Sequence, residues 1–340
     1  MRVFITGLIS EVLLPILQQE AEVKIWSGPE DAIPKKEQII QGVRKADVLV
    51  SLVTEIIDRE VMETNNRLLG IINCAVGYDN VDVTTASELG IPVTNTPGVL
   101  TDTTADLSWA LIMAVARNIV QGHCYVKKDR FKNWKPSLLL GRDVSPGGSG
   151  KSKTLGIIGF GRIGQAVFER SKGFNMGILA YDPWQKETID CTEGVEYREL
   201  VDLLRESDFV TLHTPLTDKS YHLIGEKELS LMKPTAYLIN TSRGPVIDER
   251  ALVKALQDGR IAGAGLDVYE NEPNLAPGLV DCENVVLLPH LGSASHDTRD
   301  KMGTMAAANA VAILRNERAP NTVNSEVYET EAYQSRIGSV

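Results

Sequence analysis

The stretch Gly159-Phe160-Gly161-Arg162-Ile163-Gly164 has three glycines at the spacing that is typical of a turn between a strand and a helix. It follows the apolar run TLGIIG (154–159) and leads into a segment with a helical pattern. The first glycine permits a tight turn, the second lets the backbone approach a pyrophosphate, and the third lets helix and strand pack closely. The stretch therefore predicts a strand–turn–helix unit that binds a dinucleotide; a tight turn without a ligand is the alternative.

An acidic residue follows at the distance that such a unit requires. Asp182 ends the next apolar run, MGILAYD (176–182), and lies 18 positions beyond Gly164, near the spacing of about 20 that is usual for this acid. A carboxylate there accepts hydrogen bonds from the ribose hydroxyls of NAD and repels the 2′-phosphate of NADP. The residues PWQK (183–186) contain no arginine that could bind this phosphate. The pattern predicts NAD; a helix cap is the other role open to Asp182.

Short apolar runs alternate with helical patterns along both halves of the chain. This alternation predicts parallel sheets with right-handed crossovers, and hence two doubly wound α/β domains. The expected strands are 3–7, 22–26, 47–52, 70–74, 154–159, 176–182, 208–213, 235–240, 263–268 and 284–290. The expected helices include 9–20, 35–45, 58–66 and 297–316, and the polar tail from Ser325 is expected to cover a surface or to fray.

Residues 102–130 predict one long helix that is apolar on more than one face. Such a helix must be buried against a second domain or a second subunit. We place the crossing between the two domains here, and we expect a homodimer. A loop rich in glycine, serine and proline follows at 141–153.

Charge and composition exclude several classes of protein. The net charge of −10 argues against a nucleic-acid binder, which needs a basic surface. The longest apolar runs are far shorter than the roughly 20 residues of a membrane span, and the N-terminus has no signal-peptide pattern. The four scattered cysteines predict neither a disulfide framework nor a metal site, and Cys74 is expected to be a buried small residue rather than a reactive thiol. We expect a cytoplasmic protein with no nucleic-acid or membrane partner.

Three ionisable residues follow predicted strands in the second half of the chain. Arg243 follows 235–240, Glu272 follows 263–268, and His290 ends the run 284–290. Ligands of open α/β sheets bind at the carboxyl ends of the strands, so these residues can converge. A histidine can transfer the proton of an alcohol, a glutamate can stabilise its charged form, and an arginine can bind a carboxylate. The set predicts hydride transfer to or from a small 2-oxo or 2-hydroxy acid.

With these residues in place, the chain resembles the D-isomer-specific 2-hydroxyacid dehydrogenases over nearly its whole length. The matching motifs are GFGRIG (159–164), HTPL (213–216), NTSRGPVID (240–248), GLDVYENEP (265–273) and PHLGSAS (289–295). The resemblance implies a Rossmann NAD domain, 101–294, inserted in a flavodoxin-like substrate domain made of 1–100 and 295–340. It also implies a dimer built around the long helix.

The same resemblance implies a set of site residues. Arg243, Glu272 and His290 are expected to be catalytic. The expected cofactor-binding residues are Thr104, Gly159, Gly161, Arg162, Ile163, Gly164, Asp182, His213, Thr214, Pro215, Thr241, Ser242, Arg243, Asp267, His290 and Gly292. Among them, Thr104 is expected near the nicotinamide phosphates and Asp267 near the carboxamide.

The small anionic substrate has its own expected contacts. The substrate-binding residues that the resemblance implies are Leu52, Val53, Val76, Gly77, Arg243 and His290. The backbone N–H groups of Val76 and Gly77 would bind the acid together with Arg243, and Leu52 or Val53 would contact its side group.

Within the family, the chain looks most like the glyoxylate/hydroxypyruvate reductases. It departs from them at Leu138, where a second tryptophan often follows Trp134, and in a longer loop at 143–153. A phosphite dehydrogenase-like oxidoreductase is an alternative, although no lysine lies near Val76. Glu272 argues against a formate dehydrogenase, which has glutamine there. A catalytically silent NAD-binding sensor or corepressor is the other alternative.

Overall fold

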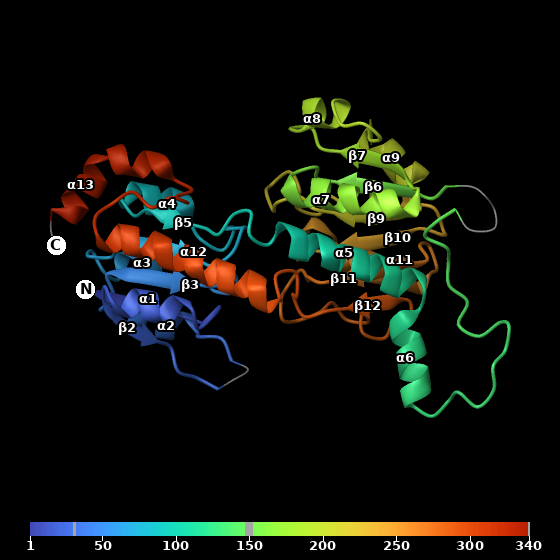
Figure 1. Ribbon diagram of the computed structural model, residues 1–340, viewed down its shortest axis with the longest axis horizontal. Helices are drawn as coiled ribbons and strands as arrows, with labels where there is room; N and C mark the ends of the chain where they lie inside the picture. The colour runs from blue at the N-terminus through green and yellow to red at the C-terminus, as the bar shows by residue number, and fades with distance from the viewer. Residues whose placement is uncertain (30–31, 147–151, 339–340) are drawn as a thin grey trace. The chain divides into compact units, whose positions relative to one another are not determined.

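The alternation of strands and helices produces two parallel sheets, one in each of two units of the chain (Figure 1). The computed structural model describes residues 1–29, 32–146 and 152–338. The first unit comprises Met1–Leu100 and Ala294–Val340, and the second comprises Thr101–Ser293. The first unit is therefore made from both ends of the chain, and the second is inserted into it.

The first unit holds a five-stranded sheet with the order β2-β1-β3-β4-β5. Its strands are β1 (Arg2–Ile5), β2 (Glu22–Ile25), β3 (Val48–Ser51), β4 (Gly70–Asn73) and β5 (Val93–Thr94). Its helices are α1 (Leu13–Gln18), α2 (Lys36–Val43), α3 (Arg59–Glu63), α4 (Val83–Glu88), α12 (His296–Leu314) and α13 (Glu331–Ile337), with the 3-10 helix η4 (Ser325–Glu329). This strand order is that of the flavodoxin-like folds.

Alternate residues of each strand in this sheet face opposite layers of helices. Val48 and Val50 belong to a core that includes Leu13 of α1 and Ala306 of α12, while Leu49 belongs to a core formed with α2, α3 and α4. Both faces of the sheet are therefore covered, as expected for parallel strands with continuous apolar sequences.

The second unit holds a seven-stranded sheet with the order β12-β11-β10-β9-β6-β7-β8. Its strands are β6 (Thr154–Ile158), β7 (Gly177–Tyr181), β8 (Glu196–Tyr197), β9 (Phe209–Leu212), β10 (Tyr237–Asn240), β11 (Gly263–Leu266) and β12 (Val285–Leu287). Its helices are α5 (Thr101–Ala116), α6 (Ile119–Lys127), α7 (Arg162–Ser171), α8 (Lys186–Asp190), α9 (Leu200–Glu206), α10 (Glu226–Leu231) and α11 (Glu249–Gln257), with the 3-10 helices η2 (Lys172–Phe174) and η3 (Gly244–Val246).

The order of these strands reverses between β6 and β9. This is the order of the Rossmann fold, which binds ligands in the crevice at the reversal. The prediction of two doubly wound domains, Rossmann and flavodoxin-like, is confirmed.

The prediction of one long helix over 102–130 is wrong. The chain forms α5 and α6, separated at Asn118, whose φ of 51° lies in the left-handed region that interrupts a helix. The Asn118 amide donates to the carbonyls of Leu139 and Leu140. Helix α5 buries its apolar side chains within the second unit, against α7, β10 and β11, whereas α6 has no buried residue.

The tail of the chain and the segment after α6 both contribute buried side chains. The tail from Ser325 packs on the first unit, because Val327, Tyr328 and Tyr333 are buried. Residues 147–151 of the glycine-rich loop lie outside the described residues, whereas Val144 packs into the core of the second unit.

No helix in the described ranges is long and apolar enough to span a membrane. The same ranges contain no cluster of three or more His, Cys, Asp or Glu side chains suited to a metal ion.

Candidate active site

The glycine stretch lies at the carboxyl end of β6, beside the end of β9. Gly159 has a φ of 91°, and a Cβ there would come within 2.7 Å of the carbonyl of His213. A Cβ on Gly164 would lie 2.1 Å from the carbonyl oxygen of Gly159, so helix and strand pack in direct contact. By contrast, no atom of the described residues lies within 4 Å of a Cβ built on Gly161, the residue that precedes α7. The open space before the helix N-terminus fits the pyrophosphate of a dinucleotide.

Asp182 follows β7 and contacts the glycine stretch directly. Its Oδ2 accepts a hydrogen bond of 2.9 Å from the N–H of Phe160, and its Oδ1 accepts one of 3.0 Å from the N–H of Trp184. The alternative in which Asp182 caps a helix is wrong, because α8 begins later and Gln185 precedes it. The carboxylate therefore orders the turn and lies at the end of β7, where a ribose is bound in this fold.

Two partly buried side chains after β9 have buried polar atoms that lack a hydrogen-bond partner. Burial of the His213 ring lowers its pKa to about 3, so the ring is neutral. Its Nε2 pairs with Oγ1 of Thr211 at 2.9 Å. Among the described residues, Nδ1 of His213 and Oγ1 of Thr214 have no hydrogen-bond partner. Unsatisfied polar atoms beside Gly159 fit a site that a polar ligand completes.

The structure brings Glu272 and His290 together. Arg243 follows β10, Glu272 follows β11, and His290 follows β12, so all three lie beyond the carboxyl ends of neighbouring parallel strands. Nδ1 of His290 lies 2.9 Å from Oε2 of Glu272, and the two side chains are 32% and 26% exposed. The pair is thus open to a substrate. Nη1 of Arg243 donates to the carbonyl of Ser242 at 2.9 Å.

Glu272 is held in its ionised form. Burial, the largest influence, acts to raise its pKa. The hydrogen bond and charge of His290, the N–H of Tyr269 and the charge of Arg243 together outweigh burial, so the pKa of Glu272 lies below its ordinary value. An ionised carboxylate beside an imidazole favours the imidazolium. This is the arrangement that a proton-transferring histidine needs.

Asp267 holds the loop that carries His290. Its backbone carbonyl accepts from the N–H of His290, and its two carboxylate oxygens accept from the N–H groups of Leu291 and Gly292 at 2.6 and 2.8 Å. The Thr104 hydroxyl donates to the carbonyl of Gly292 at 3.0 Å. The loop places His290 at a φ of 55°, which a non-glycine residue adopts only when its surroundings enforce it. This anchoring by Asp267 was not predicted from the sequence.

Two further hydroxyl-bearing residues that were predicted to bind the cofactor follow β10 in the same unit. Oγ1 of Thr241 pairs with the hydroxyl of Ser108 at 2.8 Å, and the Ser242 hydroxyl donates to Oδ1 of Asn240. Both contacts order the turn that leads from β10 to Arg243.

The predicted substrate loop belongs to the first unit and follows β4. The carbonyl of Val76 accepts from the side-chain amide of Asn95, and that of Gly77 from the side-chain amide of Asn73, both at 2.8 Å. Within the described part of the chain, the N–H groups of Val76 and Gly77 have no backbone acceptor. The preceding Cys74 is buried, and burial raises its thiol pKa to about 12, as expected of an unreactive cysteine. Leu52 and Val53, both partly exposed, follow β3 in the same unit.

Comparison with known proteins identifies the family of this chain. Residues 109–292 match the model of the D-isomer specific 2-hydroxyacid dehydrogenase NAD binding domain. A glyoxylate reductase from Korarchaeum cryptofilum is 51% identical to this chain over 329 residues, which is 96% of each protein. This chain belongs to the D-isomer specific 2-hydroxyacid dehydrogenases. The predicted family, and with it an oxidoreductase that uses a nicotinamide cofactor, is confirmed.

Another relative and two solved structures cover the chain to the same extent. A glyoxylate reductase from Pyrococcus horikoshii is 50% identical over 330 residues, 96% of each protein. A solved structure from Thermus thermophilus superposes with a TM-score of 0.86 at 40% identity, covering 95% of this chain and all of that one. An NADPH-dependent glyoxylate/hydroxypyruvate reductase from Sinorhizobium meliloti, solved with NADP and malonate, gives 0.80 at 31% identity, covering 95% of this chain and 97% of that one.

Proposed function

We propose that this chain reduces a small 2-oxo acid, glyoxylate or hydroxypyruvate, to its D-2-hydroxy acid with NADH. The observation that carries the proposal is the contact of 2.9 Å between Glu272 and His290, with the charge of Arg243 acting on the same carboxylate. Relatives that are named glyoxylate reductase, at 51% and 50% identity, support this substrate class. A sensor has no need of such a proton-transferring pair.

His290 and Glu272 would move the proton. Bound NADH supplies the hydride. Because Glu272 engages Nδ1 of His290, the other ring nitrogen, Nε2, is the one that can face a substrate. In the reducing direction the imidazolium gives its Nε2 proton to the oxygen that was the carbonyl. Glu272 stabilises the charged ring before this transfer, and such general acid catalysis contributes roughly 10²–10⁴-fold to the rate.

Arg243 and the loop at Val76 and Gly77 would each recognise the acid. The guanidinium of Arg243 is permanently charged and presents forked donors that match a carboxylate. The open N–H groups of Val76 and Gly77 are suited to the same chemistry, since consecutive backbone donors bind anions. We propose that Leu52 or Val53 contacts the side group of the substrate.

NAD would be preferred over NADP. The residues that would hold the dinucleotide include the glycine stretch, Asp182, and the unsatisfied polar atoms of His213 and Thr214. Thr104, Pro215, Thr241, Ser242 and Gly292 remain proposed contacts. The relative from Sinorhizobium meliloti is described as NADPH-dependent. In this chain, however, the Asp182 carboxylate would repel the additional phosphate.

The chain would act as a homodimer in the cytoplasm. Helix α6 and the segment after it run away from the seven-stranded sheet (Figure 1). They expose apolar side chains that a partner could cover: Ile119, Val120, Val126, Phe131, Trp134, Leu139 and Leu140. Several exposed apolar side chains on one segment favour an interface. The described cysteines are all free, which suits a reducing compartment.

Steady-state assays on one preparation test the proposal. The oxidation of NADH is followed with glyoxylate, hydroxypyruvate and pyruvate, and the reduction of NAD is followed with phosphite. We expect the highest kcat/KM with glyoxylate or hydroxypyruvate. Turnover of phosphite alone would assign the chain to the phosphite dehydrogenase-like alternative, and turnover of none of them would support a sensor.

A further inference from the structure

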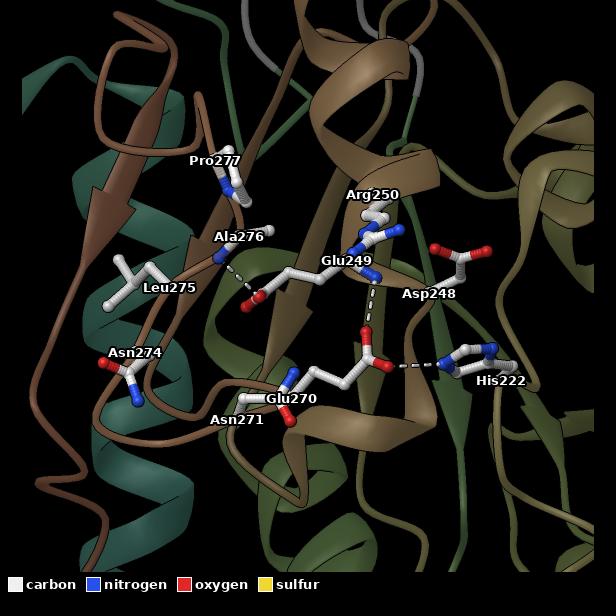
Figure 2. Close-up of a pocket in the computed structure, with 10 residues that line it drawn as sticks. All are labelled: His222, Asp248, Glu249, Arg250, Glu270, Asn271, Asn274, Leu275, Ala276 and Pro277. Carbon is white, nitrogen blue, oxygen red and sulfur yellow. Dashed lines mark hydrogen bonds and ion pairs between the residues drawn. The ribbon is translucent and has the colours of Figure 1, made fainter.

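A second histidine–carboxylate pair lies apart from Glu272 and His290 in the second unit. Nε2 of His222 lies 2.9 Å from Oε1 of Glu270, and Oε2 of Glu270 accepts a hydrogen bond of 3.2 Å from the N–H of Glu249. Figure 2 shows both contacts converging on the Glu270 carboxylate. Glu270 precedes Glu272 by two residues. Its carboxylate therefore anchors the backbone just before the proposed catalytic group.

Glu249 anchors the same segment on the other side of Glu272. Its Oε2 accepts a hydrogen bond of 2.9 Å from the N–H of Ala276, and the residue is only 4% exposed. Burial raises the pKa of Glu249; the N–H of Ala276 opposes this, and the negative charges of Glu270 and Glu272 add to it. Glu272 thus lies between two anchored points, Glu270 and Ala276.

The same cluster connects this segment to the one that carries Arg243. The N–H of His222 donates to the carbonyl of Pro245 at 2.8 Å. A Cβ on Gly244 would lie 1.8 Å from the carbonyl oxygen of Tyr269, so the two segments are in direct backbone contact. Arg243 and Glu272 are therefore held by one shared scaffold.

We propose that Glu270 is a positioning residue for the reaction, which His222 and Glu249 hold in place. It does not belong to the catalytic pair: with His222 and Glu249 it lines a cleft of about 390 Å³ whose lining includes neither Glu272 nor His290. By fixing the backbone before Glu272, it keeps the Glu272 carboxylate against Nδ1 of His290. The expected effect on kcat rests on the proposed function, whereas the expected effect on the position of Glu272 against His290 does not.

The substitution Glu270→Gln tests this role with little change in shape. An amide can accept from one of the two donors, His222 and the N–H of Glu249, but presents N–H to the other. The Glu272 carboxylate should then move away from His290. A displacement of about 1 Å in a catalytic group can cost up to about 100-fold in rate. We expect kcat with glyoxylate to fall roughly 10- to 100-fold, while the Kd for NADH stays unchanged.

An NMR titration of the His290 ring gives a readout that does not need turnover. The charged and titratable groups that face Glu272 are His290, Arg243, Asp267, Glu249 and Tyr269, and those that face Glu270 are His222 and Glu249. The variant keeps every group around Glu272. A movement of the His290 midpoint to lower pH would report that the Glu272 charge has moved away.

A double-mutant cycle separates positioning from a general loss of structure. In a Glu272→Gln background, Glu270→Gln should have little further effect on the His290 titration, because the charge that it positions is gone. Glu226→Gln is the matched control: it removes an exposed carboxylate that pairs with Lys254 at 2.9 Å in the same unit. This control should leave the titration and kcat unchanged.

The outcomes for the positioning role and for the substrate are distinct. A native protein that does not reduce glyoxylate contradicts the proposed function, whereas a His290 midpoint that moves in Glu270→Gln still supports the positioning role. An unmoved midpoint in a folded Glu270→Gln overturns that role. If Glu270→Gln does not fold, His222→Gln replaces it, since that side chain is 32% exposed. An unmoved midpoint there overturns the inference equally.

Discussion

Oε2 of Glu272 and Nδ1 of His290 lie 2.9 Å apart, although 18 positions separate the two residues along the chain. The contact exists because β11 and β12 are neighbours and parallel, so the segments after them meet at one edge of the sheet. The proposed proton-transferring pair is thus a product of the strand order.

Replacing Glu272 with glutamine should change the pH dependence of the reaction. The carboxylate is ionised at neutral pH, because its pKa is lowered by His290, Tyr269 N–H and Arg243 against the effect of burial. Its charge favours the imidazolium that gives the proton. Without it, the alkaline limb of kcat for reduction should move to lower pH by about 1–2 units. Identical profiles for the native protein and Glu272→Gln would rule out the pairing.

Replacing Asp182 with serine should weaken the preference for NADH. The carboxylate that would repel the 2′-phosphate also accepts the N–H of Phe160 at 2.9 Å. We therefore expect kcat/KM with NADPH to rise relative to NADH, and kcat/KM with NADH to fall because the glycine turn loses a hydrogen bond. The measurement is the ratio of the two kcat/KM values. A native protein that uses both cofactors equally would contradict the assignment of NAD.

His213 should make the protein less stable in mild acid. Burial lowers its pKa from 6.5 to about 3, so the unfolded chain binds a proton over this interval and the native protein does not. The free energy of unfolding therefore falls as the pH decreases, by about 1.4 kcal/mol between roughly pH 7.5 and 5.5 from this group alone. Denaturant unfolding of the native protein and His213→Gln, without cofactor, measures the difference. Equal pH dependence in the two proteins would refute the buried, neutral state.

The exposed apolar side chains after α5 should hold two subunits together. Trp134 is 73% exposed, so Trp134→Glu should weaken association without disturbing the core. Light scattering at micromolar concentration should give a dimer mass for the native protein and a lower mass for the variant. Val280→Glu is the control, because Val280 is 68% exposed in the same unit but lies outside this segment. A monomeric native protein would exclude the dimer.

The sequence predicted the features that depend on local pattern. The glycine stretch, the long strands and the ionisable residues after β10, β11 and β12 follow from periodicity and from turn chemistry. The break at Asn118 was not predicted, because it depends on contacts with carbonyls more than 20 residues away in the chain. The strands β5 and β8 were missed because two residues are too short to show a period.

The hydrogen bonds that hold the site residues in place could not be predicted from sequence patterns either. Asp267 is predicted to bind the cofactor, and that prediction does not reveal that its carboxylate accepts from the N–H groups of Leu291 and Gly292. Glu270 is one of two acidic residues in YENEP (269–273), and only the fold places His222 beside it. Such contacts join segments that come together in three dimensions, so no local signal marks them.

The substitution Arg243→Lys tests the central claim, reduction of a 2-oxo acid held by its carboxylate, most directly. Lysine keeps the charge but lacks the forked donors, and losing a partner of a buried charged hydrogen bond costs about 2–5 kcal/mol. The measurement is kcat/KM for glyoxylate with saturating NADH. We expect it to fall roughly 30- to 4,000-fold, with kcat decreasing as KM rises and the Kd for NADH changing far less. A variant with nearly full kcat/KM would contradict the account.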